Sequence, residues 1–200
     1  LASLRQLDLS INGLQSIPAE VGKLKALTLL DLAVNGLPTL PAEVGDLTSL
    51  EELYLSSNRL TGIPAKVAGL PSLKVLCLRG NNLAASSLPP EIGQTRSLQE
   101  LDVGFNAQLT AIPAQAGGLH ALRVLGLKQT GLKALPPELG KLGALVSLDA
   151  SFNQLTEIPK ELGGLKALRK LSVEANLLSR LPAEIGDLSA LEHLEASGNQ

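Results

Sequence analysis

The chain has 200 residues, 44% of them hydrophobic, which is enough for a domain with a sizeable buried core. Its 17 basic and 19 acidic residues leave a net charge of −2, which argues against nucleic acid and against a membrane surface as partners. Because 18% of the residues are charged and there are only 19 Gly and 12 Pro, neither a disordered polyelectrolyte nor a collagen-like chain fits.

A repeat runs through the whole chain and predicts its elements. Each copy reads L-x-x-L-x-L-x-x-N-x-L-x-x-[IL]-P-x-x-[VIL]-G-x-L-x-x, and its Leu-x-Leu core predicts a short strand with inward-facing leucines. The copies are 23 residues apart, except that Ala84–Ser87 contain two extra residues and Ala107–Gln108 contain one. We interpret both insertions as surface loops. The predicted strands begin their Leu-x-Leu cores at Leu7, Leu30, Leu53, Leu76, Leu101, Leu125, Leu148, Leu171 and Leu194.

Each strand is followed by residues that suit a buried turn and a brief helix. An asparagine stands five residues after the first core leucine in every copy except the sixth, where Thr130 replaces it. An asparagine amide can hydrogen-bond the backbone of the turn, and Thr130 can do only part of this. A proline then predicts the first turn of a helical segment, and glycines such as Gly22 and Gly140 are expected to end that segment.

This pattern resembles the leucine-rich-repeat family over the whole chain. The segments IPAEVGKL, LPPELGKL and LPAEIGDL are most similar to the 23-residue Ras-group intracellular subclass. Because one copy cannot bury its leucines alone, neighbouring copies must stack. We therefore predict an α/β fold, a curved leucine-rich-repeat solenoid with a parallel β-sheet on the concave face and short helical or 3-10 segments on the convex face. Residues 1–200 are predicted to form a single domain of about nine repeats whose ends are cut inside repeats.

Stacking places equivalent outward-facing strand residues in straight columns. Three such columns contain eight acidic and three basic residues, which predicts an acidic face that attracts a basic partner surface. The resemblance offers another reading, because Asp is common at the central position of such strands. The aromatic residues are either binding anchors or, for the two Phe, packing over the strand-to-turn corner. The predicted partner-binding residues are Asp31, Glu52, Tyr54, Arg79, Glu100, Asp102, Phe105, Lys128, Asp149 and Phe152.

The residues that carry enzyme chemistry are too scattered to form a site. His120 and His193 are three repeats apart, and the sequence has no C-x-x-C or H-E-x-x-H motif. The Gly-Lys pairs at 22–23 and 140–141 lack a glycine-rich phosphate loop, and Cys77 has no histidine in the neighbouring copies. We therefore predict no catalytic residues, no metal site, no cofactor and no enzyme activity.

We predict a non-enzymatic protein–protein interaction module that binds a folded partner through its concave sheet. The resemblance implies a signalling scaffold whose partner is a small GTPase, and the acidic columns predict a partner with a basic patch. An alternative is a substrate-docking or sensor segment of a larger enzyme, such as a kinase, a ubiquitin ligase or a GTPase, and the incomplete end repeats favour it. The single Cys77 and the absence of glycosylation sequons predict a cytoplasmic location and disfavour an extracellular receptor.

Overall fold

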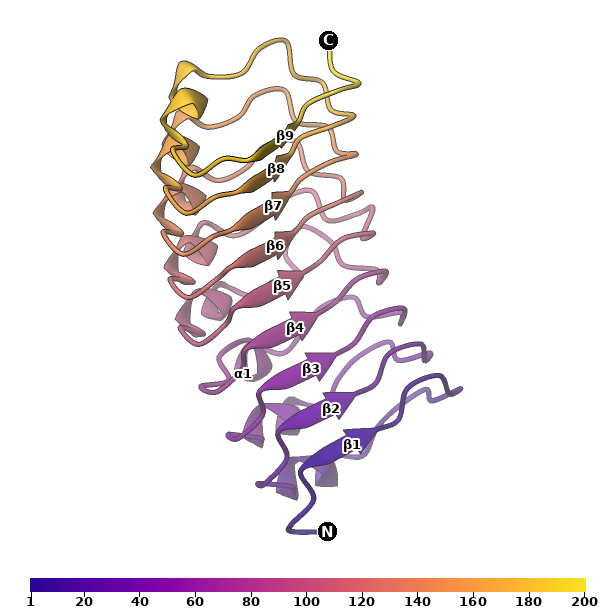
Figure 1. The fold of residues 1–200 in the computed structure, drawn as a ribbon. Helices are drawn as coiled ribbons and strands as arrows, with labels where there is room; N and C mark the ends of the chain where they lie inside the picture. Colours follow the sequence, from indigo (N-terminus) through magenta and orange to yellow (C-terminus); the bar gives the residue numbers. More distant parts are fainter.

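Nine three-residue strands form one open parallel sheet, in sequence order, in the computed structural model of residues 1–200 (Figure 1). Each strand pairs with the next so that the central leucines align, from Leu7 opposite Leu30 to Leu171 opposite Leu194. The predicted stack of repeats in register is therefore confirmed. The strands are β1 (Gln6–Asp8), β2 (Leu29–Asp31), β3 (Glu52–Tyr54), β4 (Val75–Cys77), β5 (Glu100–Asp102), β6 (Val124–Gly126), β7 (Ser147–Asp149), β8 (Lys170–Ser172) and β9 (His193–Glu195).

Short helical segments form a second column beside and behind the strands, and the two termini lie at opposite ends of the stack (Figure 1). A proline with extended backbone precedes each segment, where its missing N–H removes no helical hydrogen bond. None of these helices has the length and apolarity needed to cross a membrane. The segments are η1 (Ala19–Lys23), η2 (Ala42–Asp46), α1 (Ala65–Ala68), η3 (Pro90–Gln94), η4 (Ala114–Gly118), η5 (Pro137–Lys141), η6 (Lys160–Gly164) and η7 (Ala183–Asp187).

The core is a single cluster of 49 buried hydrophobic residues that runs between the strands and the helical segments. Leucine dominates it because the same position of the repeat fills the same place in every layer. The middle residue of each inner strand is almost fully buried, as Leu53 and Leu101 show with exposures of 0% and 1%. The two residues that flank it face outward. The α/β solenoid predicted from the repeat is thus confirmed.

The asparagine of each repeat joins its own turn to the turn of the preceding repeat. In the seventh repeat, the Oδ1 of Asn153 accepts the N–H of Leu132 at 3.1 Å. Its Nδ2 donates to the carbonyls of Leu127 at 2.8 Å and of Ala150 and Ser151 at 3.1 Å. One buried amide therefore bonds backbone groups that no water reaches, which a leucine could not do.

Thr130, which takes the asparagine position of the sixth repeat, makes only part of this network, as predicted. Its hydroxyl donates to the Leu127 carbonyl at 3.2 Å or to Oδ1 of Asn153 at 2.6 Å. The N–H of Leu109, which an asparagine at 130 would bond, donates instead to the Asn106 carbonyl at 2.9 Å. The extra residue in the fifth repeat allows that local turn, so the insertion compensates for the threonine.

The two insertions are not independent loops, because they lie against each other. Ala84 and Gln108 form an isolated parallel β-bridge, which adds a short pairing on the far side of the turn. The Ser87 hydroxyl fixes the first insertion, since it accepts the N–H of Ala84 at 2.6 Å and donates to the Thr61 carbonyl at 2.5 Å. Ala84–Ser86 and Ala107–Gln108 are exposed, as the predicted surface loops should be, and they are also ordered parts of the stack.

The asparagine network predicts an ordered pair of stability losses. Replacing Asn153 by Ala leaves the buried N–H of Leu132 without a partner and removes three amide bonds to carbonyls, of which that of Leu127 keeps the Thr130 hydroxyl, and we expect a loss of roughly 3 kcal/mol in the free energy of unfolding. Thr130→Ala removes one hydroxyl and is expected to cost about 1 kcal/mol. Urea unfolding followed by circular dichroism measures both losses. Equal losses would contradict the role assigned to the asparagine amide.

The glycines of the helical segments do not end them, which corrects the sequence-based expectation. Gly22 and Gly140 are the fourth residues of five-residue 3-10 helices, and a leucine follows each helix as its C-cap. A methyl group on either glycine would overlap the backbone carbonyl of the next segment. Ala68 fills the same position in α1, where the helix is α and the Thr95 hydroxyl of the next repeat donates to the Ala68 carbonyl. The glycines therefore allow close stacking.

Gly117 offers a test of this packing role. Its added methyl group would lie 2.5 Å from the Glu138 carbonyl oxygen and 2.8 Å from the Glu138 Cβ, so Gly117→Ala should cost about 1–3 kcal/mol of folding free energy. Gly186 holds the same position in η7 and has nothing within 4 Å, which makes Gly186→Ala the matched control. Thermal unfolding should show a lower Tm for the first variant and an unchanged or higher Tm for the second, since alanine restricts the unfolded chain.

Candidate functional site

The outward strand residues form the columns expected from the sequence. The first outward column consists of the first residue of each strand and contains Glu52 and Glu100. The third column lies two residues after the last residue of each strand and contains Arg79 and Lys128. The central column consists of the last residue of each strand, and the strand pairing places these residues side by side in a continuous row. That row is Asp8, Asp31, Tyr54, Cys77, Asp102, Gly126, Asp149, Ser172 and Glu195.

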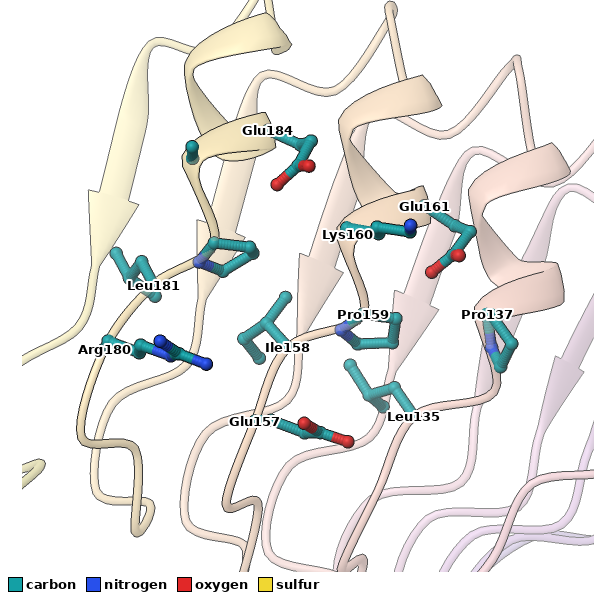
Figure 2. Close-up of a pocket in the computed structure, with 12 residues that line it drawn as sticks. Leu135, Pro137, Glu157, Ile158, Pro159, Lys160, Glu161, Arg180, Leu181 and Glu184 are labelled. Atoms are coloured by element: carbon teal, nitrogen blue, oxygen red, sulfur yellow. The ribbon is translucent and has the colours of Figure 1, made fainter.

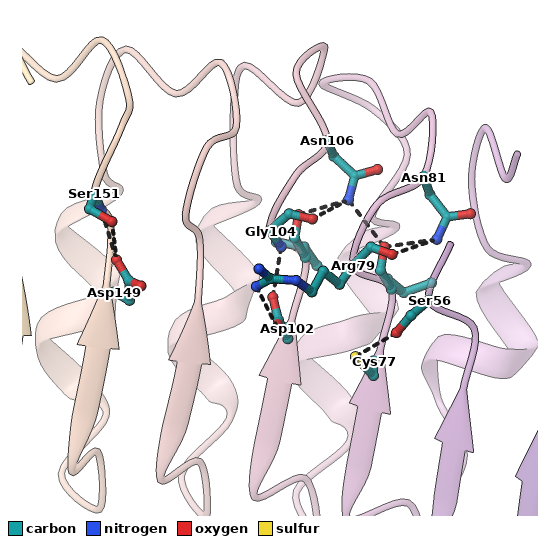
Figure 3. Close-up of polar contacts among 11 residues, drawn as sticks. Ser56, Cys77, Arg79, Asn81, Asp102, Gly104, Asn106, Asp149 and Ser151 are labelled. Atoms are coloured by element: carbon teal, nitrogen blue, oxygen red, sulfur yellow. Dashed lines mark hydrogen bonds and ion pairs between the residues drawn. The ribbon is translucent and has the colours of Figure 1, made fainter. Parts of the chain in front are cut away.

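Most aspartates of the central column hydrogen-bond their own backbone. Oδ1 of Asp31 accepts the N–H of Ala33 at 2.9 Å, and Oδ1 of Asp149 accepts the N–H of Ser151 at 3.0 Å and its hydroxyl at 2.5 Å (Figure 3). At Asp8, the equivalent bonds from the hydroxyl and then the N–H of Ser10 lower the pKa of the carboxyl. Local structure therefore accounts for aspartate at this position. The second carboxylate oxygen remains for a partner, except at Asp102, where it faces Arg79.

Tyr54 stands outward on β3 and is tied to the carboxylate two residues earlier. Its hydroxyl donates to Oε2 of Glu52 at 2.8 Å, and both side chains are partly buried. That hydrogen bond, followed by burial and by the negative charge of Glu52, raises the pKa of Tyr54 to about 12. The structure thus presents a protonated phenol held in one orientation beside an acid.

The tyrosine titration is directly measurable, because the chain contains 1 Tyr and no Trp. Ultraviolet absorbance should show tyrosinate forming with a midpoint at about 12, and Glu52→Ala should return the midpoint toward 10.0. A raised pKa adds stability that is complete below pH 10.0 and is lost as the pH rises through about 12. Glu20→Ala, an exposed acid on η1, should leave the midpoint unchanged. Circular dichroism at each pH checks that the protein remains folded.

The residue before each asparagine has left-handed backbone in every repeat, a feature that the sequence did not reveal. Their φ angles lie between 50° and 58° for the residues other than glycine, including the β-branched Ile11 and Val34. Such residues rarely adopt this conformation, which costs roughly 1–2 kcal/mol each. We call this set the turn column; it comprises Ile11, Val34, Ser57, Gly80, Phe105, Gln129, Phe152, Ala175 and Gly198.

The two phenylalanines of the turn column each lie beneath a cation of the preceding repeat. The Arg79 guanidinium carbon is 3.9 Å from the centroid of the Phe105 ring, and the Lys128 Nζ is 5.0 Å from that of Phe152. Both rings are at the strand-to-turn corner, and Phe152 is still 44% exposed. The two phenylalanines therefore pack at the corner, as one interpretation predicts, and each ring also holds a cation that a partner could contact, as the binding interpretation requires.

Arg79 also lies against Asp102 of the next strand (Figure 3). Its Nη1 is 3.6 Å from Oδ2 of Asp102, whose Oδ1 accepts the N–H of Gly104 at 2.8 Å. The arginine side chain remains 45% exposed and that of the aspartate 22%. Such an exposed ion pair contributes little to folding stability, so these charges are available for recognition.

The ten predicted partner-binding residues form a surface rather than a cluster. They extend from Asp31 on β2 to Phe152 after β7, five strand spacings or roughly 24 Å apart. Direct contacts connect only some of them, and Glu100 makes no hydrogen bond or ion pair with the others. No group of three or more His, Cys, Asp or Glu side chains is arranged to hold a metal ion, and the Sγ of Cys77 shares a hydrogen bond with the Ser56 hydroxyl at 3.0 Å.

Several depressions were not foreseen from the sequence. A cavity of about 600 Å³ lies on the helical side between the sixth and eighth repeats, where Leu135, Ile158 and Leu181 are rimmed by Glu157 and Arg180 (Figure 2). A smaller one of about 280 Å³ lies over β7–β9. Both arise from spacing between side chains of adjacent repeats, which a single repeat sequence does not show.

Comparison with known families decides the classification. The sequence profile of the family described as leucine-rich repeat region matches residues 1–112 and 106–199. The chain belongs to the leucine-rich repeat family. No curated protein matches it in sequence.

Solved leucine-rich-repeat structures have the same architecture. A protein of Leptospira interrogans is 38% identical, with a TM-score of 0.93 over 98% of this chain and 50% of that one. The plant peptide hormone receptor RGFR1, solved in complex with RGF2, is 35% identical, with a TM-score of 0.89 over 100% of this chain and 33% of the receptor. The ectodomain of the Arabidopsis thaliana membrane receptor kinase GASSHO1/SCHENGEN3 is 28% identical, with a TM-score of 0.66 over 98% and 30%. This chain therefore spans half the length of the first protein and about a third of the receptors.

Proposed function

We propose that this leucine-rich-repeat chain is a non-enzymatic module that binds a folded protein partner through its concave face. The observation that carries the proposal is the set of three aromatic side chains, one on the concave sheet and two at the turns beside it. Tyr54, Phe105 and Phe152 are the aromatic residues of the chain, and each is fixed by a contact to a charged neighbour. Rigid aromatic anchors of this kind lose little conformational entropy when a partner covers them.

Charge supports a partner with a basic region. The first and central outward columns contain seven acids and one base, Lys170. Asp31 and Asp149 accept backbone N–H groups through one oxygen and keep the other free, whereas the second oxygen of Asp102 faces Arg79, so most of the negative potential of the face remains. Complementary charge of this kind accelerates association and selects the orientation of the partner.

The family comparison supports a protein or peptide ligand, and the finer assignments are proposals. One similar structure is a peptide hormone receptor in complex with RGF2. The 23-residue copies and segments such as LPPELGKL support membership of the Ras-group subclass, and that resemblance supports a signalling scaffold with a small GTPase as partner. The cytoplasmic location stays a prediction, based on one unpaired Cys77 and the lack of sequons.

A second candidate function is the sensor or docking segment of a longer receptor or enzyme. The similarity to the ectodomain of a membrane receptor kinase, of which this chain covers 30%, favours it. Sequencing the parent transcript beyond Gln200 tests it: a catalytic domain supports the alternative, and a capping repeat followed by a stop codon contradicts it.

The concave assignment predicts a selective loss of partner. We expect a protein with Tyr54→Ala, Asp102→Lys and Asp149→Lys to capture the partners of the unmodified protein about tenfold less from cell extract, because an aromatic anchor and two acids are lost. Quantitative mass spectrometry after affinity purification measures this. Glu157→Lys with Glu161→Lys reverses two exposed acids on the helical side and should leave capture unchanged. Equal capture by the triple variant would show that the partner binds elsewhere.

A further inference from the structure

The bases and the rings of the third and turn columns occur as matched pairs. Arg79 and Lys128 are the basic residues of the third column, and Phe105 and Phe152 are the phenylalanines of the chain. Each base comes from one repeat and its ring from the next, so the same geometry appears after β4 and β5 and again after β6 and β7. Lys128 makes no side-chain hydrogen bond or ion pair, and Arg79 has only the ion pair between its Nη1 and Oδ2 of Asp102 at 3.6 Å, so its other N–H groups can bind a ligand.

Glycine keeps the surface beside Arg79 clear. A Cβ on Gly104 would lie 3.0 Å from Oδ1 of Asp102 and 3.6 Å from Nη1 of Arg79, so the missing side chain leaves room for the guanidinium over the strand. A Cβ on Gly126 would lie 2.7 Å from Oδ1 of Asp102. Between the two bases, which are two strand spacings or roughly 10 Å apart, the sheet therefore presents backbone and no bulky side chain.

The concave face consequently has opposite charges on its two sides. The first and central columns contain seven acids and one base, whereas the third column contains two bases and one acid, Glu174. Glu52 and Glu100 are in the first column, four residues before the third, which corresponds to roughly 13 Å along the strands. A partner with only basic groups would complement one side and be repelled by the other.

We propose that Arg79 and Lys128 bind acidic side chains of a partner polypeptide while Glu52 and Glu100 bind its basic side chains. This proposal rests on the concave face being the binding surface. The occupant is a polypeptide segment of mixed charge, with its acids facing the carboxyl ends of the strands and its bases facing the amino ends. The ring beneath each base restricts its motion before binding, so less entropy is lost when a carboxylate arrives.

Selection of a random phage-displayed peptide library on the immobilised protein tests the proposal. Enriched peptides should contain both acidic and basic residues, and their Kd is then measured by fluorescence anisotropy with amidated synthetic peptides. Arg79→Gln with Lys128→Gln should raise that Kd roughly tenfold or more. Phe105→Leu with Phe152→Leu keeps both charges and removes the rings, so it should raise the Kd by a smaller factor.

Lys141→Gln with Lys160→Gln is the matched control, because it removes two exposed charges from the helical side of the stack and should leave the Kd within about twofold. Thermal unfolding of each variant checks that it is folded. Peptides without acids, a Kd unchanged by the loss of Arg79 and Lys128, or no enrichment would overturn the proposal.

The triple variant with Tyr54→Ala, Asp102→Lys and Asp149→Lys separates this proposal from the wider one. If it abolishes peptide binding while the Arg79 and Lys128 variant does not, the concave interface stands and the anion-binding pair is wrong. If neither variant weakens binding, both proposals fail.

Discussion

The structure depends on backbone groups that only the next repeat can bond. The turn after each strand is buried, and the asparagine amide of the following repeat accepts its N–H, as Asn58 does for Leu37 and Asn176 for Leu155. Strand pairing and this amide bond connect the same two repeats on either side of the turn. A shift by one residue would break both and would turn the leucines outward, so register is fixed by polar and apolar terms together.

That fixed register is why the sequence predicts so much. Nine copies of one pattern define which positions face inward and which face outward. Because the copies stack in register, equivalent residues of neighbouring repeats lie side by side. The columns of Asp31, Tyr54 and Asp102 were placed correctly because nothing beyond period and register decides them. The partial role of Thr130 also followed from chemistry, since a hydroxyl cannot replace an amide that accepts and donates at once.

The features that escaped sequence reasoning all depend on distances between adjacent repeats. Gly140 is expected from one repeat to end its helix, and only the position of the Glu161 carbonyl shows that it is a packing position. Left-handed backbone at Ile11 or Val34 contradicts the preferences of β-branched residues and exists because the turn is imposed on them by neighbouring hydrogen bonds. The stacking of Arg79 on Phe105 joins residues 26 positions apart, in repeats whose spacing an insertion alters.

The same hydrogen bonds divide the outward charges into two kinds. Asp31 and Asp149 are held by their own backbone, so aspartate at these positions serves the fold even where no partner binds. Glu100 has no such bond, Lys128 has only a ring beside it, and Arg79 has a ring and an exposed ion pair with Asp102 at 3.6 Å. Charges that stabilise the strand cannot vary without cost to folding, whereas free charges can. In the interface we propose, specificity for one partner therefore lies in the free charges, and the aspartates contribute a common negative background.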